Sequence, residues 1–490
     1  MKLSLLAVCG MFIASVATAS SVSIGPGGIN AAILQGPLTL DGTGIFIGQM
    51  ETGRPGKNPP DTAAEVHPNV TPAAVYRFTS TPDPTDAQGL IGEHAQQTAG
   101  VLISNHPTSL RGVAPGATLH ASAVPGGLES DHLRTLNFIA GRNNRDVRAI
   151  NLSYGLSLGS DSPDGNSYFT RGFDWLATAY DNSLFVVAGN QGEGGAPLPK
   201  DNYNGLVVGS SAPTAGTFNK VSTTNFYGDN PTQARTEIGL IAPGEGYLTT
   251  MPGGGSTSDA EGTSIAAPHV TGTVALIQQL GERNLVNVGG PHWQNENFRE
   301  HEVSKAVLIN SADKIAGVHG STRTIVSADG TGNYDWEGST AYTDDAQPLD
   351  IQFGAGHLNA AKAATQFSAG EWDGGENIPN IGWDFGETGG VGDYRYTFED
   401  DLTADSWIAL TLTWDREVNK TGDDDTYSVG DLFSIDVPDN GLCNLDLYLV
   451  PSGSNDFEGA MSLRSIAAEQ NVEHIFAKVP ATGAYDIVVR

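Results

Sequence analysis

Basic residues are scarce in this sequence. Its 490 residues include 25 lysines and arginines against 56 aspartates and glutamates, so the formal net charge at pH 7 is −31. Nucleic acids and anionic membranes bind proteins through basic patches, and the sequence therefore predicts neither of them as a partner. The same charge fits a soluble protein of a secreted or salty setting.

Cysteine is almost absent, and the long apolar run is confined to the N-terminus. The chain has two cysteines, Cys9 and Cys443. Lys2, the apolar residues 3–16 and the small residues 17–19 have the pattern of a signal peptide, so we expect residues 1–19 to be cleaved. The mature chain then holds one cysteine and no intramolecular disulfide. We expect a monomeric secreted or cell-envelope (extracellular or periplasmic) protein, without membrane contact after cleavage.

Residues 45–367 alternate short apolar runs with amphipathic stretches. The runs are continuous, which is typical of parallel strands buried on both faces. Strand–helix alternation of this kind predicts an α/β domain with a doubly wound, mostly parallel sheet. Five runs are predicted as strands: 45–47, 117–124, 149–152, 184–187 and 206–208. Three stretches are predicted as helices: 131–141, 169–180 and 264–280.

The composition changes after this region. The stretch that follows is rich in Gly, Asp, Glu, Asn and Trp, and beyond it the apolar period becomes two, in residues 407–414 and 444–449. We therefore expect one domain over residues 20–368, a linker over 369–384 and an all-β sandwich over 385–490.

The strongest local signal is the segment 262–270, Gly-Thr-Ser-Ile-Ala-Ala-Pro-His-Val. It places Ser264 after a glycine turn at the start of an apolar helix, where the positive end of the helix dipole suits a nucleophile. A serine in that place can also cap a helix, so its position alone leaves both roles open. With Pro268 and His269, the whole segment resembles the serine motif of the subtilisin-like serine proteases (subtilases, peptidase family S8).

Further segments resemble this family in the same chain order. Residues 94–101 resemble its histidine motif, which implies that His94 is the general base. Residues 186–190 resemble its oxyanion segment. That resemblance implies that the Asn190 side chain and the backbone N–H of Ser264 donate to the developing oxyanion.

A third segment resembles the part of the family fold that pairs with substrate. It covers residues 150–155 and implies that Ser153, Tyr154 and Gly155 line the first specificity pocket. The resemblance as a whole extends over about residues 40–367. It implies a subtilisin-like catalytic domain that needs no cofactor and hydrolyses peptide bonds of a peptide or protein substrate through an acyl-enzyme.

One position departs from the family. Where the family carries the aspartate of its catalytic triad, the segment 45–53 has Glu51. A glutamate also supplies the carboxylate that holds the histidine tautomer and stabilises the imidazolium. Asp61 is the nearest substitute acid, but its proline-rich loop disfavours it.

Two functional hypotheses follow. The leading one is a secreted serine endopeptidase with a Glu51–His94–Ser264 triad. The alternative is an impaired pseudo-protease that binds peptides without cutting them.

Two acidic runs are candidates for structural calcium, residues 399–401 and 423–425. Calcium prefers carboxylate oxygens, but solvated loop charges give the same pattern. No metal ligand is therefore assigned from the sequence.

Overall fold

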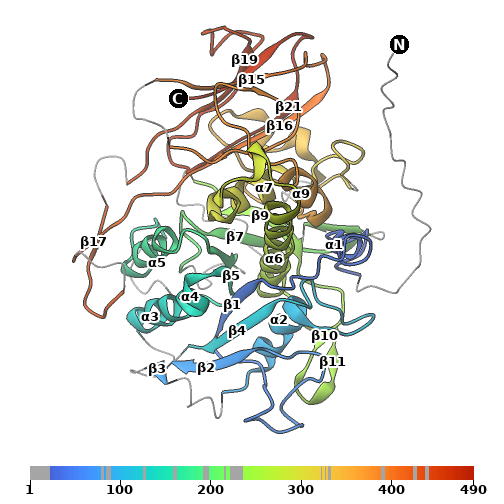
Figure 1. Cartoon of the computed structure of the whole chain (residues 1–490), viewed down its shortest axis with the longest axis vertical. Coiled ribbons are helices and arrows are strands. Elements are labelled where there is room, and N and C mark those ends of the chain that lie inside the picture. Colours follow the sequence, from blue (N-terminus) through green and yellow to red (C-terminus); the bar gives the residue numbers. More distant parts are fainter. Residues whose placement is uncertain are drawn as a thin grey trace.

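A computed structural model describes residues 22–78, 82–83, 90–124, 128–157, 163–190, 198–214, 217–220, 235–321, 323–325, 327–328, 333–387, 392–422, 427–435 and 441–490. The predicted signal peptide and the acidic run 423–425 lie outside these residues. Figure 1 shows an α/β body with a β-rich domain stacked on one end of it. Within the described ranges, no helix is long and apolar enough to cross a membrane.

The body is built on a nine-stranded sheet with the order β3-β2-β4-β1-β5-β6-β7-β8, and β9 also pairs with β7. Pairings among β1, β2, β4, β5, β6, β7 and β9 are parallel, whereas β3 and β8 pair in antiparallel fashion. This confirms the predicted mostly parallel sheet. The strands are β1 (Phe46–Glu51), β2 (Ala74–Phe78), β3 (Pro82–Asp83), β4 (Thr118–Ala123), β5 (Val147–Leu152), β6 (Leu184–Ala188), β7 (Leu206–Thr214), β8 (Thr217–Lys220) and β9 (Ile238–Pro243). Two short hairpins are β10 (Thr249–Thr250) with β11 (Ser256–Thr257), and β12 (Ser327–Ala328) with β13 (Asn333–Tyr334).

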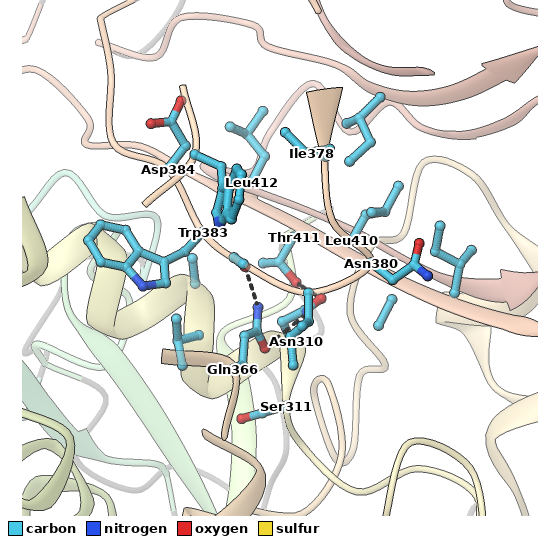
Figure 2. Close-up of a pocket in the computed structure, with 18 of the residues that line it drawn as sticks. Asn310, Ser311, Gln366, Ile378, Asn380, Trp383, Asp384, Leu410, Thr411 and Leu412 are labelled. Carbon is cyan, nitrogen blue, oxygen red and sulfur yellow. Dashed lines mark hydrogen bonds between the residues drawn. The ribbon is translucent and has the colours of Figure 1, made fainter. Parts of the chain in front are cut away.

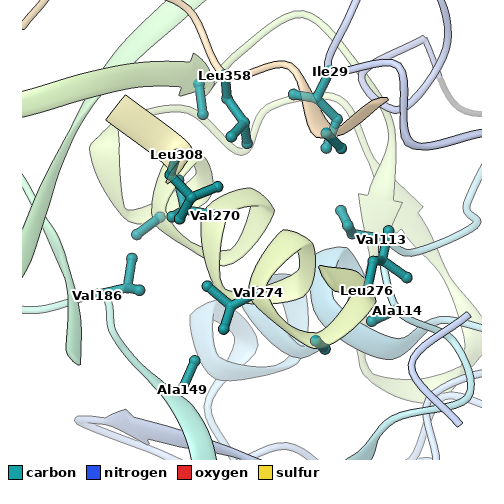
Figure 3. Packing of buried hydrophobic residues seen from close by; sticks show 14 of the residues in the cluster. Ile29, Val113, Ala114, Ala149, Val186, Val270, Val274, Leu276, Leu308 and Leu358 are labelled. Carbon is teal, nitrogen blue, oxygen red and sulfur yellow. The ribbon is translucent and has the colours of Figure 1, made fainter. Parts of the chain in front are cut away.

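Helices cover both faces of the sheet. Ala149 and Ile150 are neighbours on β5, yet Ala149 packs with Val270 and Val274 of α6 (Figure 3). Ile150 instead packs in the separate cluster beneath α3 and α5. Adjacent residues on a strand face opposite sides, so a strand covered on both faces is mostly apolar. The helices are α1 (Ala31–Gln35), α2 (Glu93–Ile103), α3 (Glu129–Ala140), α4 (Arg142–Arg145), α5 (Tyr168–Ala179), α6 (Thr263–Asn287), α7 (His301–Asn310), α8 (Thr340–Thr343) and α9 (Ala360–Phe367). The three predicted helices correspond to α3, α5 and α6.

The C-terminal domain is a sandwich of two antiparallel layers. One layer has the order β14-β15-β22-β19-β20, in which β14 and β15 alone pair in parallel, and the other consists of β16 and β21. Ile408 and Leu410 of β16 pack between the layers with Leu447 of β19. Its strands are β14 (Asn377–Ile378), β15 (Tyr394–Phe398), β16 (Trp407–Thr413), β19 (Leu447–Pro451), β20 (Leu463–Ser465), β21 (Val472–Lys478) and β22 (Tyr485–Val489). A separate hairpin of β17 (Asn419–Lys420) and β18 (Phe433–Ser434) packs through Phe433 on Trp175 of α5.

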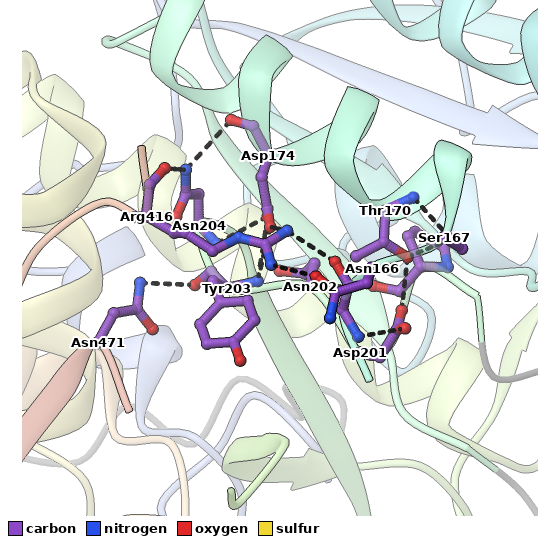
Figure 4. A network of polar contacts seen from close by, with 12 residues as sticks. Asn166, Ser167, Thr170, Asp174, Asp201, Asn202, Tyr203, Asn204, Arg416 and Asn471 are labelled. Atoms are coloured by element: carbon purple, nitrogen blue, oxygen red, sulfur yellow. Dashed lines mark hydrogen bonds and ion pairs between the residues drawn. The ribbon is translucent and has the colours of Figure 1, made fainter. Parts of the chain in front are cut away.

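A buried polar network joins the two domains (Figure 4). The fully buried Arg416 donates to Asp174 of α5 over 2.7 Å. The side chain of Asn204 donates to the carbonyl oxygen of Arg416, and the backbone N–H of Arg416 donates back to Asn204. Asn471 of the sandwich donates to the carbonyl oxygen of Tyr203. Every bond of this set fixes the sandwich against the α/β body.

Candidate active site

Glu51 is the last residue of β1, between β4 and β5 in the sheet. The side chains of α/β folds that act on ligands gather at such carboxyl ends of parallel strands. The chain leaving β1 is tied to the segment before α2, because the N–H of Arg54 donates to the carbonyl oxygen of Leu90 over 2.9 Å. A Cβ on Gly53 would lie 2.8 Å from the Cα of Gly92, so this close approach requires glycine.

His94 lies in the first turn of α2, directly after this contact. Its Nδ1 atom is 3.2 Å from Oε2 of Glu51, and its Nε2 atom is 2.8 Å from Oγ of Ser264. The structure therefore brings together three side chains that are far apart in the sequence. Their order, carboxylate to imidazole to hydroxyl, is that of an acid–base–nucleophile triad.

The pKa values of the pair respond to burial and to each other. Burial raises the pKa of Glu51, whose side chain is 2% exposed, although the hydrogen bond and charge of His94 oppose this shift. Burial lowers the pKa of His94, but the hydrogen bond and charge of Glu51 outweigh burial and raise it overall. Oε2 of Glu51 also accepts a hydrogen bond from the N–H of Thr52 over 3.3 Å. Its Oε1 atom has no hydrogen-bond partner among the described residues.

Ser264 is not the cap of its helix. The cap position is Gly262, whose φ of 124° suits glycine alone, and Ser264 follows inside the first turn of α6. Its hydroxyl contacts His94 instead. The helix-capping alternative is therefore wrong.

Hydrogen bonds from neighbouring side chains hold the backbone around the nucleophile. Ser153 donates to the carbonyl oxygen of Ser264 over 2.7 Å, and Asn151 donates to Oγ of Ser153 over 2.8 Å. Thr263 donates to the carbonyl oxygen of Gly189 over 2.7 Å. Sequence reasoning missed Asn151 and Thr263 as parts of the site. The signal for Asn151 was a polar residue inside the otherwise apolar run 149–152.

Asn190 follows β6 and is half-buried. The bond from Thr263 to the preceding Gly189 brings its backbone next to the start of α6, which carries Ser264. Strand β6 and the start of α6 thus set the position of the Asn190 backbone next to the segment that carries Ser264. The role of Asn190 in the oxyanion hole stays a prediction.

The three predicted pocket residues differ in what they present. Ser153 is engaged with Ser264, and Gly155 is half-buried. The Tyr154 side chain is 9% exposed and its hydroxyl lies 3.1 Å from Nδ1 of His132 on α3. It packs in the hydrophobic cluster between α3, α5 and the sheet. Any contact of Tyr154 with a substrate would therefore come chiefly from its backbone.

Asp61, the substitute acid considered from the sequence, pairs with Arg54 and not with His94. Asp61 forms two hydrogen bonds with the guanidinium of the buried Arg54, over 2.6 and 2.7 Å. This bidentate pair leaves Glu51 as the carboxylate in contact with His94.

Two groups of possible metal ligands occur among the described residues, both away from the triad: His301, Glu302 and Asp415, and Glu371, Asp373 and Asp384. Both ring nitrogens of His301 are engaged, with the carbonyl oxygen of Asp181 and with Asp415. Burial lowers the pKa of His301, but the charges of Asp415 and Glu302 outweigh it and raise the pKa to about 10. A protonated histidine is no metal ligand. Neither group contains the acidic run 399–401.

Comparisons with known proteins identify the family of this chain. The sequence model of a family described as the subtilase family matches residues 42–356. Alkaline elastase YaB of Bacillus sp. (strain YaB) is 27% identical over 300 residues, which cover 61% of this chain and 68% of the relative. Subtilisin Savinase of Lederbergia lenta is 27% identical over 285 residues, which cover 56% of this chain and 87% of the relative. The crystal structure of MycP1 without its N-terminal propeptide aligns with a TM-score of 0.44 and 18% identity, over 69% of this chain and 94% of the other.

Proposed function

Since this chain belongs to the subtilase family of serine proteases, we propose that it is a secreted serine endopeptidase with Glu51, His94 and Ser264 as its triad. The observation that carries the proposal is the pair of contacts made by His94, 2.8 Å to Oγ of Ser264 and 3.2 Å to Glu51. Secretion rests on the N-terminal pattern of residues 1–19.

The reaction follows from this arrangement. Oγ of Ser264 attacks the scissile carbonyl carbon while Nε2 of His94 takes the hydroxyl proton. The carbonyl oxygen becomes an oxyanion that accepts hydrogen bonds from the backbone N–H of Ser264 and the side chain of Asn190. The C–N bond then breaks, His94 gives its proton to the leaving amine, and an acyl-enzyme remains. Water, deprotonated by His94, attacks the ester and releases the second product and Ser264.

Glu51 stabilises the imidazolium that forms in each half-reaction. It also selects the tautomer in which Nδ1 carries hydrogen and Nε2 is free to accept the serine proton. Both tasks need a carboxylate, and a glutamate meets them when the backbone accommodates one extra methylene. The contacts of Glu51 with His94 and Thr52 support this accommodation.

A pseudo-protease is the second candidate. The observation in its favour is the unpartnered Oε1 atom of Glu51, because an unpaired buried carboxylate oxygen destabilises the charged form that the imidazolium needs. The two candidates make opposite predictions about Ser264.

Labelling with a fluorophosphonate separates them. We expect the folded chain to form an adduct at Ser264 and to cleave an unstructured protein such as casein, with neither activity in Ser264→Ala. A folded chain that binds peptides but forms no adduct would instead be a pseudo-protease.

A further inference from the structure

A cavity of about 1130 Å³ lies between the α/β body and the sandwich, and no residue of the triad lines it. Helix α7, the segment 378–387 and strand β16 contribute its walls, and Figure 2 shows Thr411 of β16 with Asn380 and Trp383 of that segment. Asn380 and Ile381 are exposed, so the cavity is open to solvent along this segment. Its volume suits a sizeable ligand rather than an ion.

The cavity runs along the edge of β16. Ile408 and Leu410 face the sandwich core, whereas Thr411 and Thr413 face α7, where they donate to Asn310 and to the carbonyl oxygen of Glu302. Yet residues 408–415 all line the same cavity. Successive side chains of a strand point to opposite faces of its sheet. A cavity that contacts the side chains of both faces of β16 must therefore pass around the edge of this strand.

Within the described part of the chain no second strand pairs with this edge, although Nε2 of His319 lies 2.8 Å from the carbonyl oxygen of Trp407 at its start. There β16 pairs with β21 and with no other strand. Every second residue of an edge strand directs its N–H and C=O groups outward, and these groups are a template for another extended chain. With seven residues, β16 is long enough to pair with a segment of about five to seven residues.

Three buried polar atoms in the walls lack a hydrogen-bond partner among the described residues, although the other carboxylate oxygen of Asp384 accepts from Tyr396 over 2.7 Å. Among the described residues, Oδ1 of Asp384 and Nε1 of Trp414 are buried without a hydrogen-bond partner. Oε2 of Glu302 also has no hydrogen bond, although Nδ1 of His301 lies 3.4 Å away. A ligand that satisfies all three atoms must both donate and accept. The described charged residues that line the cavity are Glu302, Asp384, Glu387, Asp401, Asp415 and one lysine, Lys362.

From the edge and these walls we propose that the cavity is a binding site for an extended, basic segment of polypeptide, which adds a strand to β16. Backbone N–H and C=O groups match the unpaired edge at its own spacing, and pockets beside it receive alternate side chains. Basic side chains match the excess of carboxylates. A small organic cation supplies no acceptor for Trp414, and a sugar does not repeat the spacing of a strand.

The natural occupant is a segment of a protein substrate, held away from the scissile bond. That identification rests on the proposed function, whereas the binding of a basic extended peptide does not. A second contact raises the local concentration of a long substrate at the triad and leaves a short peptide unaffected.

Photo-cross-linking locates the peptide directly. The probe is a peptide of about eight alternating valines and lysines, a length chosen to span β16, with a fluorescent label and photo-leucine at one valine. With the full Ser264→Ala chain we expect a dissociation constant below about 1 mM and cross-links within residues 378–387 and 408–415. Cross-links only around His94 and the first turn of α6, or no saturable binding, would overturn the proposal.

Two N-methylated peptides test the pairing. One carries N-methyl groups at the odd residues and the other at the even residues. A strand pairs with its neighbour through the N–H groups of every second residue. One methylated peptide is therefore expected to bind about tenfold more weakly than the unmethylated peptide, and the other to bind as tightly as the unmethylated peptide. Equal affinities of the two peptides, or of a peptide with glutamate in place of lysine, contradict strand addition to an acidic site.

Variants of the walls give a second comparison. We expect Asp384→Asn and Trp414→Phe each to raise the dissociation constant of the lysine–valine peptide about fivefold to tenfold. The controls are Asp345→Asn, whose carboxylate pairs with Arg464, and Trp175→Phe, which packs against Phe433, both outside the cavity. Thermal denaturation identifies a variant that fails to fold, and the methylated peptides then decide the question without any variant.

The outcomes distinguish this proposal from the proposed function. Cross-links in the cavity without fluorophosphonate labelling of the wild-type chain would leave a peptide-binding protein that is not a protease. Labelling with cross-links confined to the triad region would leave a protease without this second site.

Discussion

The triad and the cavity differ in how far their polar groups are engaged, although Oε1 of Glu51 at the triad also lacks a hydrogen-bond partner among the described residues. At the triad both ring nitrogens of His94 have partners, and Ser153 and Asn151 hold the backbone of Ser264. In the cavity, Asp384 and Trp414 each leave a buried polar atom without a partner among the described residues. A site that performs chemistry is positioned in advance by its own protein, whereas a site that recognises a chain leaves bonds for that chain to make.

Removing His94 gives the largest expected effect. His94→Ala deletes the proton acceptor, and kcat is expected to fall by about 10⁶-fold, a magnitude taken from subtilisin itself. Steady-state kinetics on a short chromogenic peptide measures this change. The half-buried surface residue His106 provides the matched control, and His106→Ala is expected to leave kcat within about twofold. A similar loss of kcat in both variants would show that the loss comes from impaired folding and not from the missing proton acceptor.

Changing Glu51 tests whether the glutamate is adapted to its position. Glu51→Gln removes the charge that stabilises the imidazolium, and kcat is expected to fall by about 10⁴-fold. Glu51→Asp keeps the charge and moves it, so a fall of up to about 10²-fold is expected. Unchanged kcat in Glu51→Gln would mean that Glu51 is not the triad acid. A large gain in Glu51→Asp would mean that the glutamate impairs the site.

Replacing Asn190 removes one donor to the oxyanion. Asn190→Ala is expected to lower kcat roughly 10²–10³-fold with little change in KM, a magnitude that again comes from subtilisin. Asn105→Ala, at a surface pair with Asn69, is the control. A change in KM alone would assign Asn190 to substrate binding instead of transition-state stabilisation.

The pH dependence gives the smallest and most specific effect. His94 accepts a proton only when it is neutral, so kcat/KM rises with pH through the pKa of His94, which Glu51 raises above 6.5. The stability that the raised pKa of His94 contributes is present below pH 6.5 while Glu51 is ionised, and it is lost as the pH rises through that raised pKa. Proton NMR of the His94 ring in Ser264→Ala should give a midpoint above 6.5, and Glu51→Gln should lower it. A midpoint below 6.5 in the first protein would contradict the pairing.

The two regions also differ in what the sequence predicts. Five of the nine strands of the sheet are visible in the sequence because burial on both faces makes them continuously apolar, as at Ala149 and Ile150, whereas β2, β3, β8 and β9 were not predicted. His94 and Ser264 are visible because each lies in a contiguous motif. The direction of the Tyr154 side chain cannot be predicted from the sequence, because it depends on packing against α3 and on the contact with His132.

The cavity leaves no such local signal. Glu302, Asp384 and Trp414 come from three separate elements, and each is an ordinary residue in its own segment. Only the packing of the sandwich on the body brings them together. Strand β14 has two residues and no measurable period, so its pairing with β15 also comes from tertiary contacts.

Fluorophosphonate labelling of the folded wild-type chain, followed by peptide mass spectrometry, tests the central claim most directly. The geometry of His94 and Ser264 predicts one adduct, on Ser264, formed more slowly in Glu51→Gln and absent in Ser264→Ala. No adduct on Ser264 in a chain shown to be folded would contradict the account of this protein as a serine endopeptidase.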